Sequence, residues 1–494
     1  MMRLFRTVLG VAFLALVVLY SAVLIVHQIK PLPDGVQYRG APHTVPEDAV
    51  TLYSDRTFVD ADGIRHSEQQ IFDEVFSMIE EARHVIVLDM FLFNNFQGET
   101  VEDERSLTDE LTRALIEKKD EYPDITVVFI TDPINTVYGG YDSPEIAALE
   151  DAGVEVVITD LSFLRDSNPI YSSLWRVALA PFGNTTEGGR IPNIFDRRID
   201  PVTVRSYLDL LNFRANHRKL ILADRPMGDG YTLSVLVTSA NPHTASSAHS
   251  NIAVRVDGQI WRDVMFTESV VLHLSDASVP MLPPDLLRGL QEPPGGSVEV
   301  FLITEGSIRT AILEEIGRAK RGDRIEMMMF YLSDRSVINA LVDAAERGVE
   351  IRLLLDPNKD AFGREKGGIP NRPVAAELLR RTGGTLSIRW CATHGEQCHH
   401  KALAVLRDNG EGFLTVGSAN LTRRNIGGFN LETNVAVSGE ATAPLFEEWN
   451  ALFDEKWHNR GGRLYSHEAS LYTDDSWRSF VQYYIMERTG MSSF

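Results

Sequence analysis

The sequence predicts an α/β protein made of two similar halves, preceded by one membrane-spanning helix. Two observations lead to this prediction: an uncharged run near the N-terminus, and a pattern of strands and helices that occurs twice along the chain. Apolar strands that alternate with amphipathic helices are typical of a buried sheet covered by helices. We expect an anchor at residues 1–30, halves at 48–279 and 297–460, a linker at 280–296 and a tail at 461–494.

The composition is that of a globular protein. Hydrophobic residues make up 44% and charged residues 24% of the 494 residues, which excludes a disordered or collagen-like chain. The 48 Lys and Arg residues and 69 Asp and Glu residues give a net charge of −21. Binding dominated by phosphate contacts needs clustered cations, so no nucleic-acid partner is expected.

Residues 1–30 have the pattern of a membrane anchor. Arg3 and Arg6 precede an uncharged run over residues 7–26, and about 20 apolar residues are enough to cross a bilayer. The charges on the N-terminal side predict a single-pass protein of a bacterial-type inner (plasma) membrane, with its catalytic body outside the cytoplasm. The alternative is a cleaved signal peptide, although no A-x-A cleavage site follows.

Each half is predicted to begin with the same elements. In the first half these are a helix at 68–83 and strands at 84–93, 125–131 and 154–159. In the second half they are a helix at 308–320 and strands at 324–332, 351–355 and 386–390. The middle strand of each set ends in an Asp-Pro turn, at Asp132 and Asp356. The Pro- and Gly-rich residues 280–296 separate the halves, because neither helix nor strand interiors tolerate such a composition.

Two segments fall outside this repeat. In the first half the next motif, at His217, comes 85 positions after Asp132, whereas in the second half His399 comes 43 positions after Asp356. The extra segment includes an apolar stretch at 170–180, which is either a helix packed on the body or a contact with lipid or acyl chains. The aromatic-rich tail is either a closing helix or a second contact with lipid.

Each half then has a hairpin that starts with His-x-Lys and ends with Ser-x-Asn. The residues are His217, Lys219, Ser239 and Asn241 in the first half, and His399, Lys401, Ser418 and Asn420 in the second. Residues two apart on a strand lie on one face, so each half brings an imidazole, an ammonium, a hydroxyl and an amide together. Two such sets around one anion suit phosphoryl transfer: one His attacks phosphorus, the other protonates the leaving oxygen, and the remaining groups hold the phosphate.

These paired motifs resemble the phospholipase D superfamily, and most closely its bacterial cardiolipin synthase-type phosphatidyltransferases. The first copy matches the family's His-x-Lys-x4-Asp (HKD) motif through Asp224, with Thr238 in place of a glycine. The second copy keeps Gly417 but has Leu406 at the Asp position. The resemblance implies a duplicated fold with the active site at the pseudo-twofold interface, and neither metal nor other cofactor. It makes His217, Lys219, His399, Lys401 and Glu432 catalytic, Ser239, Asn241, Ser418 and Asn420 phosphate-binding, and Asp224 a structural support.

The resemblance also implies that an acidic residue of one half orients the imidazole of the other. Glu432 would then support His217 as the nucleophile, and His399 would be the general acid and later the base. In the first half His249 stands in the corresponding stretch, so it is expected to take the acidic residue's place.

Cys391 and Cys398 are the chain's two cysteines. If the body lies outside the cytoplasm, a disulfide just before His399 is expected. The alternatives are a zinc site that also uses His394 and His400, or two free thiols.

The functional prediction is a membrane-anchored phosphatidyltransferase that acts on glycerophospholipids through a covalent phosphohistidine, as cardiolipin synthases of this superfamily do. Its expected partners are a membrane phospholipid and the bilayer, and it is expected to act as a monomer because both motif copies lie in one chain. The alternatives are a phospholipase D that releases phosphatidic acid, a nuclease or other phosphodiesterase of the superfamily, and a non-catalytic binding protein.

Overall fold

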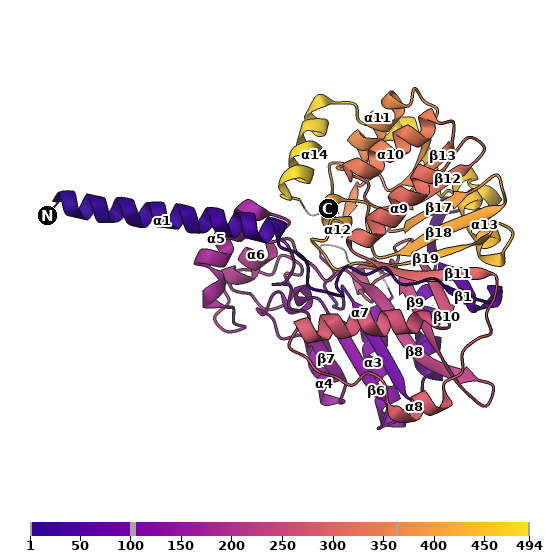
Figure 1. Ribbon diagram of the computed structural model, residues 1–494, viewed down its shortest axis with the longest axis horizontal. Coiled ribbons are helices and arrows are strands. Elements are labelled where there is room, and N and C mark those ends of the chain that lie inside the picture. Colours follow the sequence, from indigo (N-terminus) through magenta and orange to yellow (C-terminus); the bar gives the residue numbers. More distant parts are fainter. Residues whose placement is uncertain (1, 99–104, 362–363, 493–494) are drawn as a thin grey trace.

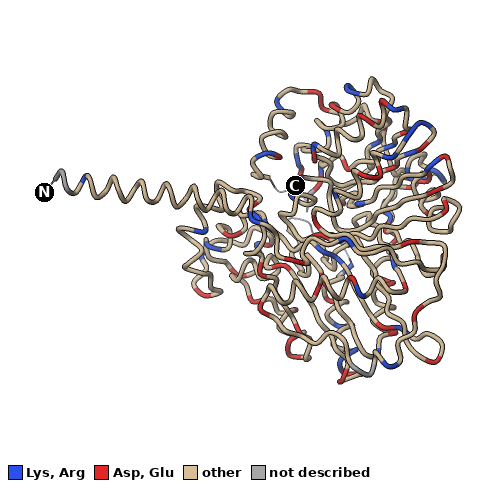
Figure 2. Tube along the Cα trace, viewed as in Figure 1, with Lys and Arg blue, Asp and Glu red and all other residues tan. Residues whose placement is uncertain are grey.

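The computed structural model describes residues 2–98, 105–361 and 364–492 (Figure 1). Helix α1 (Met2–Ile29) projects from one side of a body that contains two large sheets. Its segment Phe5–Ile29 is long and apolar enough to cross a membrane and is not buried inside the body. Figure 2 shows the helix without charged residues beyond its first turns.

The first half contains a seven-stranded sheet in the order β2-β10-β9-β8-β5-β6-β7. Its strands are β2 (Val50–Ser54), β5 (Val85–Met90), β6 (Thr126–Thr131), β7 (Glu155–Ile158), β8 (Lys219–Met227), β9 (Gly230–Thr238) and β10 (Ile252–Asp257). Strands β5, β6 and β7 are parallel and the other neighbours antiparallel. The helices are α2 (Ile71–Glu81), α3 (Leu107–Glu121), α4 (Pro144–Asp151) and α7 (Ile260–Leu274).

The second half contains a nine-stranded sheet in the order β1-β11-β19-β18-β17-β12-β13-β16-β20. Its strands are β1 (His43–Val45), β11 (Val298–Thr304), β12 (Arg324–Met329), β13 (Glu350–Leu355), β16 (Ser387–Cys391), β17 (Lys401–Leu406), β18 (Glu411–Gly417), β19 (Thr433–Glu440) and β20 (Ser466–Glu468). The helices are α9 (Gly306–Arg318), α10 (Arg335–Glu346), α11 (Asn371–Arg381), α12 (Arg423–Ile426) and α13 (Pro444–His458).

The two sheets repeat one topology. Strands β2, β10, β9, β8, β5, β6 and β7 correspond in order to β11, β19, β18, β17, β12, β13 and β16, and the second sheet adds β1 and β20 at its edges. The predicted duplicated α/β fold is therefore confirmed. The strands expected to continue to 93 and 332 end earlier, at Met90 and Met329, and the aromatic residues that follow them turn toward the space between the halves.

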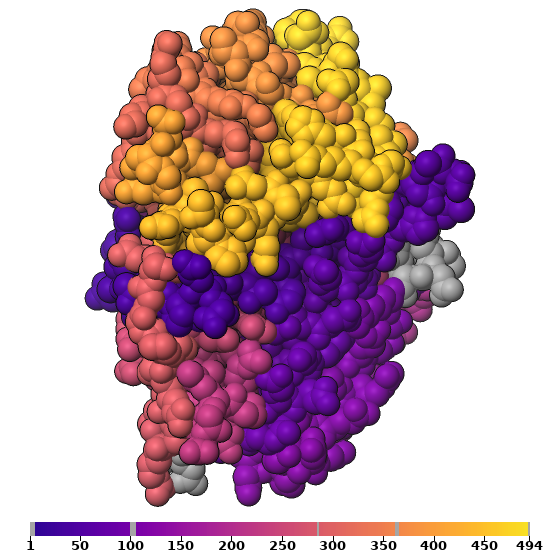
Figure 3. Space-filling model, turned by 90° about the vertical axis from the view of Figure 1, so that its right-hand side faces the viewer, coloured from indigo at the N-terminus to yellow at the C-terminus, as the bar shows by residue number. Residues whose placement is uncertain are grey.

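The sheets pack against each other around one shared core. This core includes Val235, Val237 and Val254 of the first sheet together with Leu414 and Val435 of the second, all at most 1% exposed. Two further apolar clusters cover the opposite faces of the sheets. On the face away from α1, the C-terminal part of the chain meets the N-terminal strands along a continuous seam (Figure 3).

The segments outside the repeat form short elements. They are β3 (Arg56–Val59), β4 (Arg65–Glu68), β14 (Asp360–Ala361), β15 (Arg364–Glu365), α5 (Pro169–Ala178), α6 (Val204–Leu210), α8 (Pro284–Gly289) and α14 (Trp477–Thr489). Helix α8 lies in the linker that was expected to hold no helix. This is possible because its proline stands in the first turn, where no backbone N–H is needed. Helix α5 packs beside α1, and the Tyr20 hydroxyl donates to the Ile170 carbonyl at 2.9 Å.

Candidate active site

The Asp-Pro turns hold the start of each His-x-Lys strand. The Asp132 carboxylate accepts a hydrogen bond from the backbone N–H of Asn216 at 2.7 Å, and Asp356 accepts one from that of Cys398 at 2.8 Å. Both carboxyls are fully buried, which raises the pKa of Asp132 to about 7 and that of Asp356 to about 6. Sequence reasoning treated these residues as turns, but each of them fixes the backbone immediately before a histidine.

His217 is held by the second half. Its backbone N–H donates to the Leu431 carbonyl at 2.9 Å, and its Nδ1 lies 2.9 Å from Glu432 Oε2. A carboxylate can only accept, so Nδ1 carries the proton and Nε2 keeps a free lone pair. Burial lowers the pKa of His217 to about 4, although Glu432 acts in the opposite direction. His217 is therefore a neutral base at physiological pH.

His399 has the equivalent environment in the other half of the repeat, but its Nδ1 faces an amide instead of a carboxylate. Its backbone N–H donates to the Ser250 carbonyl at 2.8 Å, and its Nδ1 lies 3.1 Å from Asn251 Oδ1. His249 does not take the place of the acidic residue as expected; it accepts a hydrogen bond from the Gln397 N–H at 3.3 Å. Asn251 immediately precedes β10, as Glu432 immediately precedes β19, and this position in the repeat could have identified it.

The two lysines lie beside the histidines and are completely buried. Lys219 Nζ donates to the His217 carbonyl at 2.7 Å and lies 4.9 Å from the centre of the Phe91 ring. In the second half Lys401 Nζ donates to the His399 carbonyl at 3.1 Å and lies 5.4 Å from the centre of the Phe330 ring. Burial lowers the pKa of Lys219 to about 7 and that of Lys401 well below its usual value. An anion bound between them would favour their charged forms.

The serines and asparagines of the motif have different surroundings. The Ser418 hydroxyl donates to Glu432 at 2.5 Å, and the Ser239 hydroxyl donates to Asn251 at 3.1 Å. Each hydroxyl thus contacts the side chain that orients an imidazole. The phosphate-binding role predicted for the serines remains a prediction.

One cavity of about 640 Å³ joins the two halves at these residues. Four motif residues lie on its wall: His217, His399, Asn241 and Asn420. Half of the other lining residues are aromatic or aliphatic, and the surface of the cavity is mainly apolar; these residues include Phe91, Phe96, Ile134, Tyr138, Ile194, Phe195, Leu210, Phe213, Phe330 and Tyr331. The structure therefore brings both histidines to a single, mainly apolar cavity.

Comparison with known proteins agrees with this geometry. Residues 312–457 match the family model described as cardiolipin synthase, PLD-like domain. The fold is similar to that of phosphatidylserine synthase from Haemophilus influenzae Rd KW20, with a TM-score of 0.53 and 11% identity over 91% of this chain and 95% of that one. Residues 312–457 are thus similar to a phospholipase D-like domain, and the chain as a whole is similar in fold to this synthase. Nuc from Salmonella typhimurium, a phospholipase D family member, also matches, with 22% identity over 34% of this chain and 97% of that one, at a TM-score of 0.26. No curated protein matches the sequence of this chain.

The match of residues 312–457 to a phospholipase D-like domain indicates an enzyme of the phosphatidyltransferase or phosphodiesterase type. Asp224, the Asp of the first motif copy, holds a strand end: it accepts hydrogen bonds from the backbone N–H groups of Arg83, His84 and Val85 at the start of β5. In the second half Leu406 pairs with Arg324 at the start of β12. These contacts indicate that Leu406 alters a strand end and leaves the reacting groups in place.

Cys391 and Cys398 form a disulfide, as the sequence predicted for a body outside the cytoplasm. This pairing removes both thiols from the alternative zinc site. Within the described ranges, no group of three or more His, Cys, Asp and Glu residues is arranged to hold a metal ion.

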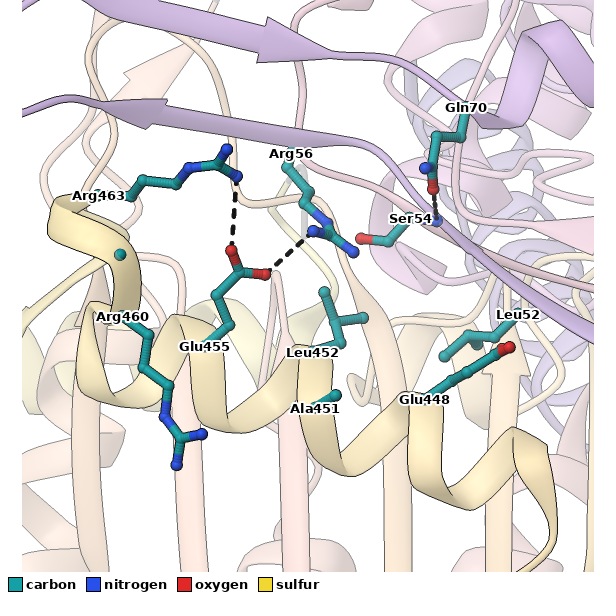
Figure 4. Close-up of a pocket in the computed structure, with 11 residues that line it drawn as sticks. Leu52, Ser54, Arg56, Gln70, Glu448, Ala451, Leu452, Glu455, Arg460 and Arg463 are labelled. Carbon is teal, nitrogen blue, oxygen red and sulfur yellow. Dashed lines mark hydrogen bonds and ion pairs between the residues drawn. The ribbon is translucent and has the colours of Figure 1, made fainter.

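A second hollow, of about 730 Å³, lies at the seam between the halves and contains none of the motif residues. Figure 4 shows Glu455 between two arginines, at 3.0 Å from Arg56 and 3.5 Å from Arg463. The pair with Arg56 joins β3 to α13, and the pair with Arg463 lies within the C-terminal part of the chain. The hollow therefore belongs to the contact between the halves.

Proposed function

We propose that the protein is a membrane-anchored phosphatidyltransferase of the phospholipase D type, acting on glycerophospholipids and most like the cardiolipin synthases. The observation that carries this proposal is the pair of His217 and His399 on the wall of one mainly apolar cavity. An apolar cavity suits a lipid better than the phosphates and sugars of a nucleic acid. The match of the second half to a cardiolipin synthase domain supports the same substrate class.

In the first step His217 Nε2 attacks the phosphorus of the donor lipid. A phosphorus–nitrogen bond forms, the bond from phosphorus to the leaving alcohol oxygen breaks, and His399 gives its Nε2 proton to that oxygen. Burial lowers the pKa of His399 well below its usual value, so His399 carries this proton only when an anionic phosphodiester lies beside it. Lys219 and Lys401 favour the negative charge that develops on the phosphate oxygens.

In the second step an alcohol enters where the first one left. His399 takes the proton of the incoming hydroxyl, its oxygen attacks phosphorus, and the bond to His217 breaks. A lipid alcohol yields the transfer product, whereas water yields phosphatidic acid. The two outcomes share one intermediate, and the apolar wall of the cavity favours the lipid alcohol.

We also propose the arrangement in the membrane and along the chain. Helix α1 crosses the bilayer once, with the N-terminus in the cytoplasm and the body on the other side, which agrees with the disulfide. The halves extend over 48–279 and 297–460. The enzyme acts as a monomer, because one chain supplies both imidazoles and the residues that orient them.

The test is product analysis by mass spectrometry after the detergent-solubilised full chain is incubated with phosphatidylglycerol and a chelator. Cardiolipin and glycerol should appear with the intact protein and not with His217→Asn. The control is His66→Asn, which removes a half-exposed imidazole of β4 outside the cavity and should keep the activity. Phosphatidic acid alone would identify a hydrolase, and no lipid turnover would overturn the proposal and direct the next assay to nucleic acid.

The nucleophile can be identified with a phosphodiester whose leaving group needs no protonation. His399→Asn should then accumulate a phosphorylated enzyme, and peptide mapping should find the phosphate on His217. A phosphate found on His399 in the reciprocal His217→Asn variant would reverse the two roles.

A further inference from the structure

Outside α1, exposed apolar side chains gather on two short helices of the body. On α5 and the turn after it these are Ile170, Leu174 and Phe182, with 60%, 52% and 73% of their surfaces exposed. On α14 they are Trp477, Val481 and Ile485, with 70%, 42% and 53% exposed. Both helices lie on the side of the body from which α1 projects (Figure 1). The four-residue spacing of Ile170 and Leu174, and of the three residues on α14, places the exposed groups within each helix on one face.

We propose that these six residues form a membrane-contact surface, which rests in the headgroup region and outer hydrocarbon of the bilayer beside the mouth of the active-site cavity. The inference rests on one part of the proposed function, the crossing of the bilayer by α1. It adds that the body itself enters the membrane and receives its substrate there.

The depth of α5 follows from its contacts with α1. The Tyr20 hydroxyl donates to the Ile170 carbonyl at 2.9 Å, and Lys30 Nζ donates to the Ser162 carbonyl at 3.1 Å. The uncharged run at 7–26 has the length of the hydrocarbon core, about 30 Å at 1.5 Å per residue. Tyr20 comes six residues before the end of this run, so the start of α5 lies about 9 Å inside the hydrocarbon boundary. Interfacial helices bury their apolar faces to a depth of about 5–10 Å.

The α14 part of the surface adjoins the α5 part. Gly490 ends α14 and packs directly on the Ser167 carbonyl, which an added Cβ would approach to 1.7 Å. Arg424 donates to the Gly490 carbonyl at 3.4 Å and also lies on the cavity wall, 5.0 Å above the ring of Phe213. The membrane-contact surface therefore borders the cavity, and the acyl chains of a bound lipid can extend from one into the other.

The continuity of this surface with α1 favours a bilayer over a protein as its occupant. A protein that covered Ile170 would have to lie beside Tyr20 of α1, at a depth that hydrocarbon fills. The same surface carries exposed apolar groups from the first half and from the C-terminal tail, whereas monomeric proteins in water expose such groups singly.

The test uses the full chain in nanodiscs of phosphatidylcholine and phosphatidylglycerol. An environment-sensitive fluorophore is attached to Leu174→Cys or Ile485→Cys, while the native cysteines stay paired in their disulfide. The matched control is Leu287→Cys on α8, which is 51% exposed and lies away from α1 (Figure 1). Lipids brominated along the acyl chains should quench the first two labels at least about threefold more strongly than the control. Equal quenching at all three sites would overturn the proposal. The proposal would also be overturned if a second copy of this chain covered the label at position 174 in detergent, because the surface would then be an interface between copies.

A second measurement separates this inference from the proposed function. Leu174→Asp should lower turnover of phosphatidylglycerol in nanodiscs by about tenfold relative to Leu287→Asp, and leave turnover in detergent micelles within about twofold. Equal turnover of the two variants in nanodiscs would overturn the membrane-contact surface while leaving the enzyme intact. Absence of turnover by the unmodified chain would overturn the proposed function, and the quenching experiment would still decide the inference.

Discussion

The contact between Glu432 and His217 allows a quantitative test by Glu432→Gln. The carboxylate accepts hydrogen bonds from His217 Nδ1 at 2.9 Å, from the Ser418 hydroxyl at 2.5 Å and from the Asn425 amide. A glutamine has one oxygen and one NH2 group, so at least one of these three donors loses its acceptor and faces the NH2 group. The Asn425 amide cannot rotate freely to correct this, because its oxygen accepts a hydrogen bond from Thr422.

The expected loss follows from the charge that forms on the imidazole. A full positive charge on His217, 2.9 Å from the carboxylate, is attracted by about 6 kcal/mol at an effective dielectric constant of about 20. The imidazole gains only part of this charge in the transition state, and glutamine still offers a neutral hydrogen bond worth about 1 kcal/mol. We expect a loss of about 3 kcal/mol, or about two orders of magnitude in kcat/KM.

The assay is the pH profile of kcat/KM for lipid turnover, with Glu326→Gln as the control because Glu326 is also buried but contacts Trp449 instead of an imidazole. Glu432 raises the pKa of His217 against the larger effect of burial. Its removal should lower that pKa further below about 4, so the acid limb of the profile moves to lower pH while the plateau falls. The control should change activity by less than about twofold. A plateau that falls by less than about threefold, or an acid limb that moves to higher pH, would refute the reasoning.

Three other results are expected. Because burial lowers the pKa of Lys219 to about 7, kcat/KM should fall as pH rises through about 7. Bound phosphate favours the charged amine, so kcat should fall only at higher pH. Falls of kcat/KM and kcat at the same pH would contradict this. Reduction of the Cys391–Cys398 disulfide, whose cysteines are 7 residues apart, should lower the free energy of unfolding by about 2.5 kcal/mol in a denaturant titration, and an unchanged value would contradict this. Ser418→Ala should lower kcat by about tenfold and Ser239→Ala by less, because only the first hydroxyl donates to a carboxylate; equal losses would indicate that both act on phosphate directly.

The regular elements were predictable because each depends on local patterns. Alternating apolar strands and amphipathic helices identified both sheets and their repeat. The boundaries were less accurate where strand pairing decides them: the helix expected from 68 starts at Ile71, because Arg65–Glu68 pairs with Arg56–Val59 as a hairpin.

The candidate site was predictable where it depends on residue type and spacing. The His-x-Lys and Ser-x-Asn positions needed only the periodicity of a strand. Asn251 was missed because a search for an acidic or titratable side chain passes over a neutral amide. The roles of Asp132 and Asp356 were missed because they act through backbone N–H groups, which carry no signature in the sequence.

The difference between Glu432 and Asn251 gives the two imidazoles unequal chemistry in a nearly symmetric frame. Each is held at Nδ1 by the other half, but only His217 faces a group that can neutralise a developing positive charge. In the proposed mechanism this makes His217 the imidazole that carries the covalent phosphoryl group, whose formation makes the ring cationic. His399 is held by a neutral amide, so its proton is not stabilised by a neighbouring negative charge and is lost more easily than a proton on His217. This suits a general acid that must later act as a base. The division of roles in the proposed mechanism therefore follows from one residue position that precedes the same strand in both halves.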